Sequence, residues 1–144
     1  MLPNPYQQYR ATKVETAGQV DLVVMLYQGA VRFIRLGIEG LEHDDHKAAH
    51  TNLLRAQDIV AELLGSLNRE AGGQIASQLA AVYDYCYRRL VFANVRRDTA
   101  AAREVLAIIR DLGGAWQQIA ARQRQAQAAG QRLPVNARPA AMAV

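Results

Sequence analysis

The residues most suited to chemistry are three histidines that lie close together, His43, His46 and His50, with Asp44 and Asp45 between them. On a helix, His46 and His50 would share one face and could hold a metal ion together with a carboxylate. The same residues are more often a solvated, polar start of a helix. A di-iron centre in a helical bundle needs Glu-x-x-His pairs, and no glutamate of this chain has a histidine three residues later. We therefore expect no metal site.

The single cysteine, Cys86, lies between two tyrosines in an apolar stretch. A catalytic thiol needs a lowered pKa and a partner base, and the histidines lie in a separate part of the chain. We expect Cys86 to be buried and inert.

One cysteine forms no intramolecular disulfide, which fits a reducing compartment. The Gly72–Gly73 pair lacks the framework of a phosphate-binding loop. We thus expect a protein that is not an enzyme and uses no cofactor.

Four segments of the chain carry apolar residues at helical spacing. The residues that step by three and four are Val20, Val24, Tyr27, Val31, Ile34, Ile38 and Leu41; then Ala49, Leu53, Ala56, Val60, Leu63 and Leu67; then Ile75, Leu79, Val82, Cys86, Leu90 and Ala93; and last Ala102, Val105, Ile109, Leu112, Trp116 and Ile119. Asp45 and Asp98 are predicted N-caps, and residues 68–73 are predicted to break the chain between the second and third helices. This pattern predicts an all-α protein, an antiparallel up-and-down four-helix bundle.

The two ends of the chain lack this pattern. Residues 1–16 hold two prolines and no helical period, which predicts an extended N-terminal segment. The bundle is predicted over residues 17–122. Residues 123–144 are rich in Ala, Gln and Arg, which predicts a basic, mostly disordered tail, with an extension of the fourth helix into it by a turn or two left open. The pair Gly113–Gly114 inside the fourth helix is a local weak point, at a cost of about 1 kcal/mol for each glycine relative to alanine.

The charge of the chain resides in its tail. The net charge is +4, from 17 Lys and Arg against 13 Asp and Glu. Four of the arginines follow Asp111, the last acidic residue, so the preceding part has 17 − 4 = 13 basic residues against 13 acidic ones. A nucleic-acid binder would cluster positive charge on its folded surface. We expect no signal peptide, because the first residues lack a basic region followed by an apolar one, and the sequence has no run of the roughly 18 apolar residues that a membrane helix needs. We expect a cytoplasmic protein without membrane insertion or nucleic-acid partner.

Two of the predicted helices carry more apolar surface than the core of a four-helix bundle needs. The additional apolar residues are Leu22, Leu26, Phe33 and Leu36 in the first helix, and Tyr83, Tyr87 and Leu90 in the third. Alternatively, the tyrosines merely flank the core with wet hydroxyls. In a bundle without catalytic residues, surplus apolar faces indicate a surface that receives another amphipathic helix. The residues by themselves leave that partner unnamed.

Three stretches of the chain resemble a known family. Thr16–Ala17 followed by LVVMLYQGA (22–30), AQDIVAELL (56–64) and YDYCYRRLVFAN (83–94) are similar, in order and spacing, to signatures of the FliS family of flagellar secretion chaperones. The resemblance covers about residues 6–120. The family often has Ser-Pro where this chain has Gly18 and Gln19, which leaves Thr16 or Asp21 to cap the first helix. Cys86 and Phe92 stand where methionine and glutamate are expected.

The resemblance implies a cytoplasmic chaperone without nucleotide. Its client would be the disordered C-terminal segment of flagellin, kept from premature polymerisation until export by the flagellar type III secretion system, and components of the export apparatus are open as further partners. By matching positions, the expected client-binding residues are Leu22, Met25, Leu26, Tyr27, Ile59, Leu63, Tyr83, Tyr87 and Leu90. We add Tyr6, Tyr9 and Val14, because the N-terminal segment is expected to cover the client surface when no client is bound, or else to contact the client directly.

Two other functions stay open at this point. The first is an RNA-binding bundle that uses Arg88, Arg89, Arg96, Arg97 and the basic tail. Its affinity would fall steeply with salt, whereas an apolar groove would be nearly insensitive to salt. The second is a metal-dependent enzyme built on the histidine cluster.

Overall fold

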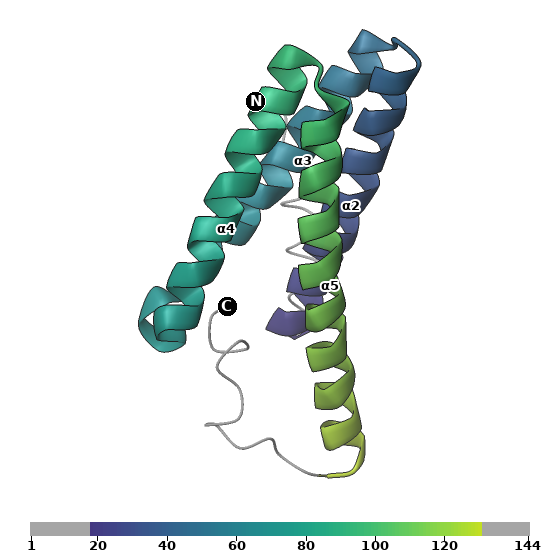
Figure 1. The fold of residues 1–144 in the computed structure, drawn as a ribbon. Coiled ribbons are helices and arrows are strands. Elements are labelled where there is room, and N and C mark those ends of the chain that lie inside the picture. The colour runs from purple at the N-terminus through teal and green to yellow at the C-terminus, as the bar shows by residue number, and fades with distance from the viewer. Residues whose placement is uncertain (1–17, 131–144) are drawn as a thin grey trace, which may run out of the picture.

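The computed structural model describes residues 18–130, which form four α-helices (Figure 1). These are α2 (Gln19–Glu42), α3 (His46–Gly65), α4 (Arg69–Arg96) and α5 (Thr99–Ala128). The described part contains no strand, so the all-α prediction is confirmed. None of its helices has the length and apolarity that crossing a membrane requires. The predictions for residues 1–16 and 131–144, which include Tyr6, Tyr9 and Val14, lie outside the described residues.

Each helix packs against its neighbours around a square. α2 packs on α3 and α5, and α4 packs on the same two helices, so α2 and α4 face each other across a diagonal. Figure 1 shows α4 and α5 close together at one end of the bundle and diverging toward the other.

Tyr27 of α2 and Tyr83 of α4 bridge the diagonal through their hydroxyls, 2.5 Å apart. Because both rings are buried, the pKa of each phenol is raised, and the two hydroxyls satisfy each other in the core.

Side-chain caps set the starts of three helices. Asp45 accepts a hydrogen bond from the backbone N–H of Ala48 (3.1 Å), and Asp98 accepts one from Ala101 (2.9 Å), as predicted. Asn68 caps α4 in the same way. The first residue before α2 is Gly18, which offers no side-chain cap. The expected cap at Asp21 is therefore corrected: Asp21 lies within the first turn and pairs with Arg124 of α5 at 2.9 Å.

The predicted break between the second and third helices lies at residues 66–68, slightly before the predicted residues 68–73, and a kink follows inside α4. α4 already begins at Arg69, and the kink lies at Gly73, whose φ of 55° and ψ of −128° suit glycine. The buried stripe of α4 also differs from the prediction at its start. Ala76 and Ala80 face the core instead of the bulkier Ile75 and Leu79, which are half-buried. Small side chains at these positions let α4 approach its neighbours closely.

α5 continues into the predicted tail. It reaches Ala128, six residues past the predicted domain boundary at 122, which agrees with an extension of the fourth helix by a turn or two. The alanine, glutamine and arginine residues of this stretch have high helix propensity. The ion pair between Arg124 and Asp21 also ties this end of α5 to the first turn of α2.

Candidate functional site

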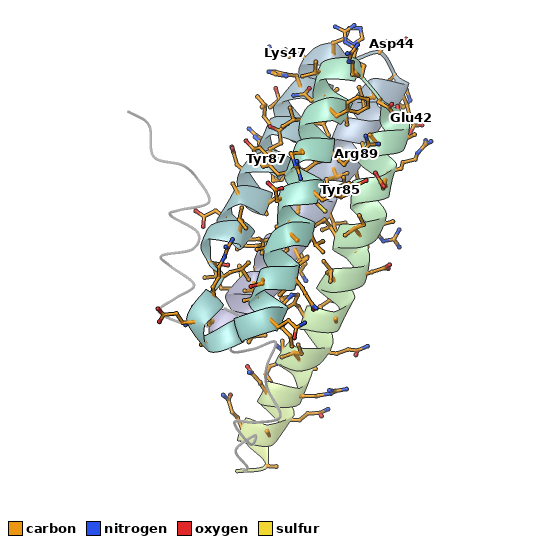
Figure 2. The ribbon with its side chains drawn as sticks, turned by 60° about the vertical axis from the view of Figure 1, so that its left-hand side comes forward. Glu42, Asp44, Lys47, Tyr85, Tyr87 and Arg89 are labelled. Atoms are coloured by element: carbon orange, nitrogen blue, oxygen red, sulfur yellow. The ribbon has the colours of Figure 1, made fainter. Side chains whose placement is uncertain are left out.

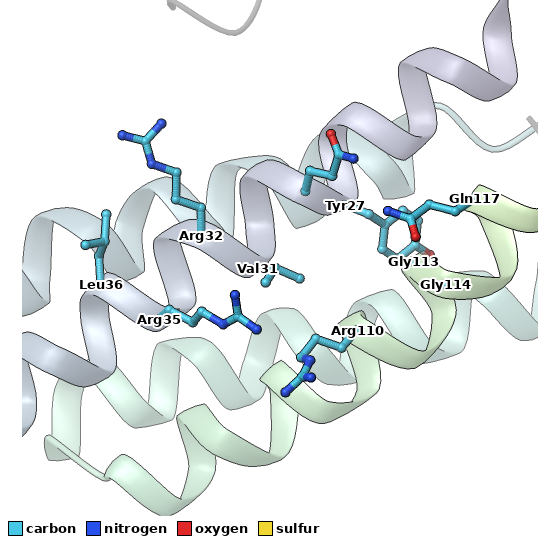
Figure 3. A pocket seen from close by; sticks show the side chains of 10 residues that line it. Tyr27, Val31, Arg32, Arg35, Leu36, Arg110, Gly113, Gly114 and Gln117 are labelled. Carbon is cyan, nitrogen blue, oxygen red and sulfur yellow. The ribbon is translucent and has the colours of Figure 1, made fainter. Parts of the chain in front are cut away.

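A groove of about 520 Å³ lies between α2 and α5 (Figure 3). We call it the α2/α5 groove. Its lining residues are Tyr27, Gln28, Val31, Arg32, Arg35 and Leu36 from α2, and Arg110, Gly113, Gly114 and Gln117 from α5. Its volume is in the range of ligand-binding clefts, and its position between two neighbouring helices suits an added helix or extended segment.

Two adjacent glycines of α5 create this groove. A Cβ atom added to Gly113 would lie 3.3 Å from the Cβ of Tyr27, so the glycine allows α5 to approach α2 closely at that level. A Cβ added to Gly114 would meet nothing within 4 Å. The missing side chain of Gly114 therefore leaves open space above a floor that includes Tyr27 and Val31. The pair that weakens an isolated helix thus shapes a hollow in the folded bundle.

Arginines line one end of the α2/α5 groove. Figure 3 shows Arg35 entering from α2 and Arg110 from the opposite wall, α5, whereas Arg32 points away. Arg32 instead lies 5.7 Å from the centre of the Phe33 ring. Within residues 18–130, Arg35 and Arg110 form neither an ion pair nor a hydrogen bond, and no carboxylate lines the groove. We call Arg35 and Arg110 the groove arginines. The site thus combines an apolar floor with positive charge.

A second apolar surface lies on the outside of α4. We call it the α4 outer face; its exposed residues are Tyr85, Tyr87, Val91, Phe92 and Val95. Val95 is the most exposed, at 72%. Figure 2 shows Tyr85 and Arg89 toward α5 and Tyr87 toward α3.

Two arginines of the α4 outer face, Arg88 and Arg89, have partners within the bundle. Arg88 pairs with Asp84 at 2.8 Å, and Arg89 pairs with Glu104 of α5 at 2.9 Å. Arg89 also lies 4.9 Å from the centre of the Phe92 ring. These guanidinium groups are therefore already engaged by neighbouring side chains.

The expected client-binding residues of the described part fall into two groups. Seven of them are buried in the bundle: Leu22, Leu26, Tyr27, Ile59, Leu63, Tyr83 and Leu90. Met25 is half-buried and Tyr87 is 38% exposed. The stripe of Tyr83, Tyr87 and Leu90 is thus divided, because Tyr83 and Leu90 face the core while Tyr87 faces outward. Of the whole set, Tyr27 lines the α2/α5 groove.

Sequence reasoning missed most of the groove. The missed residues are Gln28, Val31, Arg32, Arg35, Arg110 and Gln117, whereas Leu36 was among the surplus apolar residues of the first helix. The signal that could have found it is the Gly113–Gly114 pair, because two glycines inside an amphipathic helix indicate close approach or open space. Which helix would face them is a property of the tertiary structure.

The histidines and the cysteine have separate surroundings. His43 bonds to the backbone oxygen of Glu39 at 2.8 Å, and His50 bonds to the side chain of Asn94. His46 lies beside the guanidinium of Arg97. Among residues 18–130 no group of three potential metal ligands comes together. Cys86 is buried as predicted, and burial raises the pKa of its thiol to about 11, which disfavours the reactive thiolate.

The architecture is that of a small helical-bundle binding protein with a groove between two of its helices. Residues 2–123 match the family described as "Flagellar protein FliS". The chain is 41% identical to the flagellar secretion chaperone FliS of Bacillus subtilis (strain 168) over 117 residues, which are 81% of this chain and 86% of that protein. It is 36% identical to the chaperone of the same name from Salmonella typhimurium (74% and 79% covered) and 31% identical to that from Escherichia coli K12 (73% and 78%). The chain belongs to the FliS family of flagellar secretion chaperones.

Proposed function

We propose that this chaperone binds the C-terminal segment of flagellin in the cytoplasm, prevents its premature polymerisation and supports its export by the flagellar type III secretion system. We further propose that part of the client enters the α2/α5 groove as an amphipathic helix. The family supports the chaperone class, and the groove supports the binding mode. The half-buried Val31 and the exposed Leu36 of its lining offer apolar surface to the apolar stripe of a client, next to the buried ring of Tyr27.

The energetics of such a groove fit a client that is unfolded on its own. Ordering a disordered segment costs free energy, and burying its apolar stripe offsets that cost. The buried residues Ile59, Leu63 and Leu90 act through the bundle that holds the groove walls in place. Met25 and Tyr87 retain accessible surface and stay proposed contacts of a longer client segment. The N-terminal segment, with Tyr6 and Tyr9, stays a proposed cover of the client surface.

The open space at Gly114 provides the experiment for this proposal. Gly114→Met fills the groove without meeting another atom at its Cβ, and it removes a glycine from a helix, which favours folding by about 1 kcal/mol. We expect an unchanged or raised melting temperature and at least about tenfold weaker binding of a flagellin C-terminal peptide, measured by titration calorimetry.

A matched control comes from Gly65, the last residue of α3, whose Cβ would also meet nothing within 4 Å. Gly65→Met should leave the affinity unchanged. Undiminished peptide binding by the folded Gly114→Met protein would overturn the groove proposal. The RNA-binding alternative has less support, because Arg88 and Arg89 are engaged in ion pairs.

A further inference from the structure

We propose that Arg35 and Arg110 form a carboxylate clamp that selects client segments with an acidic side chain next to their apolar stripe. This inference rests on the proposed function, because it concerns the same groove. It names what the apolar floor alone does not specify: the charge and the spacing of the segment that binds.

The first support is the arrangement of the groove arginines. Both enter one stretch of the groove from opposite walls (Figure 3), and no described carboxylate lies between them. Elsewhere in the bundle, Arg103 pairs with Glu42 and Arg124 pairs with Asp21, both at 2.9 Å. Two guanidinium groups that converge repel each other. A carboxylate between them would remove that repulsion and accept charge-assisted hydrogen bonds from both sides.

The charged neighbours of the groove arginines do not complete this site. Glu39 lies one helical turn beyond Arg35 on α2, and Asp111 follows Arg110 on α5, but both are exposed and neither lines the groove. In the part of the chain that the structure describes, neither forms an ion pair with the groove arginines. The acceptor is therefore expected from the bound partner.

The second support is the apolar floor, which determines the class of partner. Arg110 precedes Gly113 by three residues and Gly114 by four, so the clamp and the open space lie about one helical turn, roughly 5.4 Å, apart along α5. An occupant must fill the space above Gly114 with an apolar side chain and place a carboxylate one turn away. On an amphipathic helix, this corresponds to an acidic residue three or four positions from an apolar one. A free phosphate would use only the arginines.

The test is a double-mutant cycle between the groove arginines and the client. The protein variants are Arg35→Gln, Arg110→Gln and the double variant, and the probe is a flagellin C-terminal peptide in which each Asp or Glu is changed in turn to its amide. We expect the double variant to bind the peptide about tenfold to thirtyfold more weakly. One acid-to-amide change should weaken binding to the original protein equally and have no further effect on the double variant. Arg69→Gln, at the exposed start of α4, is the control and should change the affinity less than twofold.

The other outcomes overturn the inference. If amidation of the peptide's own C-terminus alone reproduces the loss, the clamp holds a terminal carboxylate and not an acidic side chain. If the original protein binds polyuridylate and the double variant does not, the arginines serve nucleic acid. If Gly114→Met abolishes peptide binding while the arginine variants do not affect it, the groove still binds the client but the clamp proposal is wrong. If neither change affects binding, the groove proposal and the clamp proposal are both wrong.

Discussion

The α2/α5 groove and the α4 outer face both present apolar side chains next to arginines, but the two surfaces differ in whether those arginines form ion pairs. On the α4 outer face, Arg88 and Arg89 pair with Asp84 and Glu104 of the same bundle. In the groove, Arg35 and Arg110 converge on a hollow that no described carboxylate lines. The face is the outward side of one helix, whereas the groove lies between two.

This difference indicates which of the two surfaces needs a partner. Scattered exposed apolar residues are normal on soluble proteins, and on the α4 outer face ion pairs within the bundle neutralise the charges of Arg88 and Arg89. The groove combines space, apolar surface and positive charge that its own lining residues do not neutralise. We therefore infer that the groove is the main binding surface and that the α4 outer face contributes less.

The largest expected effect separates two tyrosines that are one helical turn apart. Tyr83 is fully buried and bonded to Tyr27, whereas Tyr87 is 38% exposed on the α4 outer face. Tyr83→Ala should lower the free energy of unfolding by about 3–5 kcal/mol, because it creates a cavity and leaves the Tyr27 hydroxyl without its partner. Tyr87→Ala should lower it by less than about 1 kcal/mol and weaken client binding only a few-fold. Chemical denaturation and peptide titration measure both, and equal destabilisation by the two changes would contradict the division into core and surface.

A smaller effect is expected from salt. Raising the salt concentration from about 0.05 to 0.5 M should weaken client binding about threefold to fivefold, because it screens the contacts of Arg35 and Arg110 with a carboxylate. In the Arg35→Gln/Arg110→Gln protein, the same change should have less than a twofold effect. Anisotropy titrations at several salt concentrations measure this. A loss of several hundredfold would indicate contacts with many phosphates, and identical slopes for the two proteins would exclude a role of the groove arginines.

The elements of the fold were predictable because their signals are local. The four helices and the capping side chains of Asp45 and Asp98 depend on residues close in the chain, and the structure confirms them, although the buried stripe of α4 is shifted at its start to Ala76 and Ala80. The break between α3 and α4 lies a few residues earlier than predicted, because Asn68 caps a helix that begins before the kink at Gly73.

The site was far less predictable, because it depends on how the helices meet. Leu22 and Leu26 looked like surplus apolar surface, and both are buried in the bundle. Arg35 and Arg89 both lie on predicted helices, and the sequence does not show which of them has an acidic partner. The ion pair between Arg89 and Glu104 forms only because α5 packs beside α4. The Gly113–Gly114 pair was visible as a weak point, but its meaning emerges only when Tyr27 packs opposite it.

The most direct test of the central claim is to map the client on the two surfaces. Backbone amide signals of the isotope-labelled protein would be followed by NMR during titration with the flagellin peptide. If the client binds mainly in the α2/α5 groove, the largest shifts occur at Val31, Gly113 and Gly114, with smaller ones at Tyr87 and Val91. Large shifts on the α4 outer face, with the signals of the α2/α5 groove unchanged, would contradict the central claim.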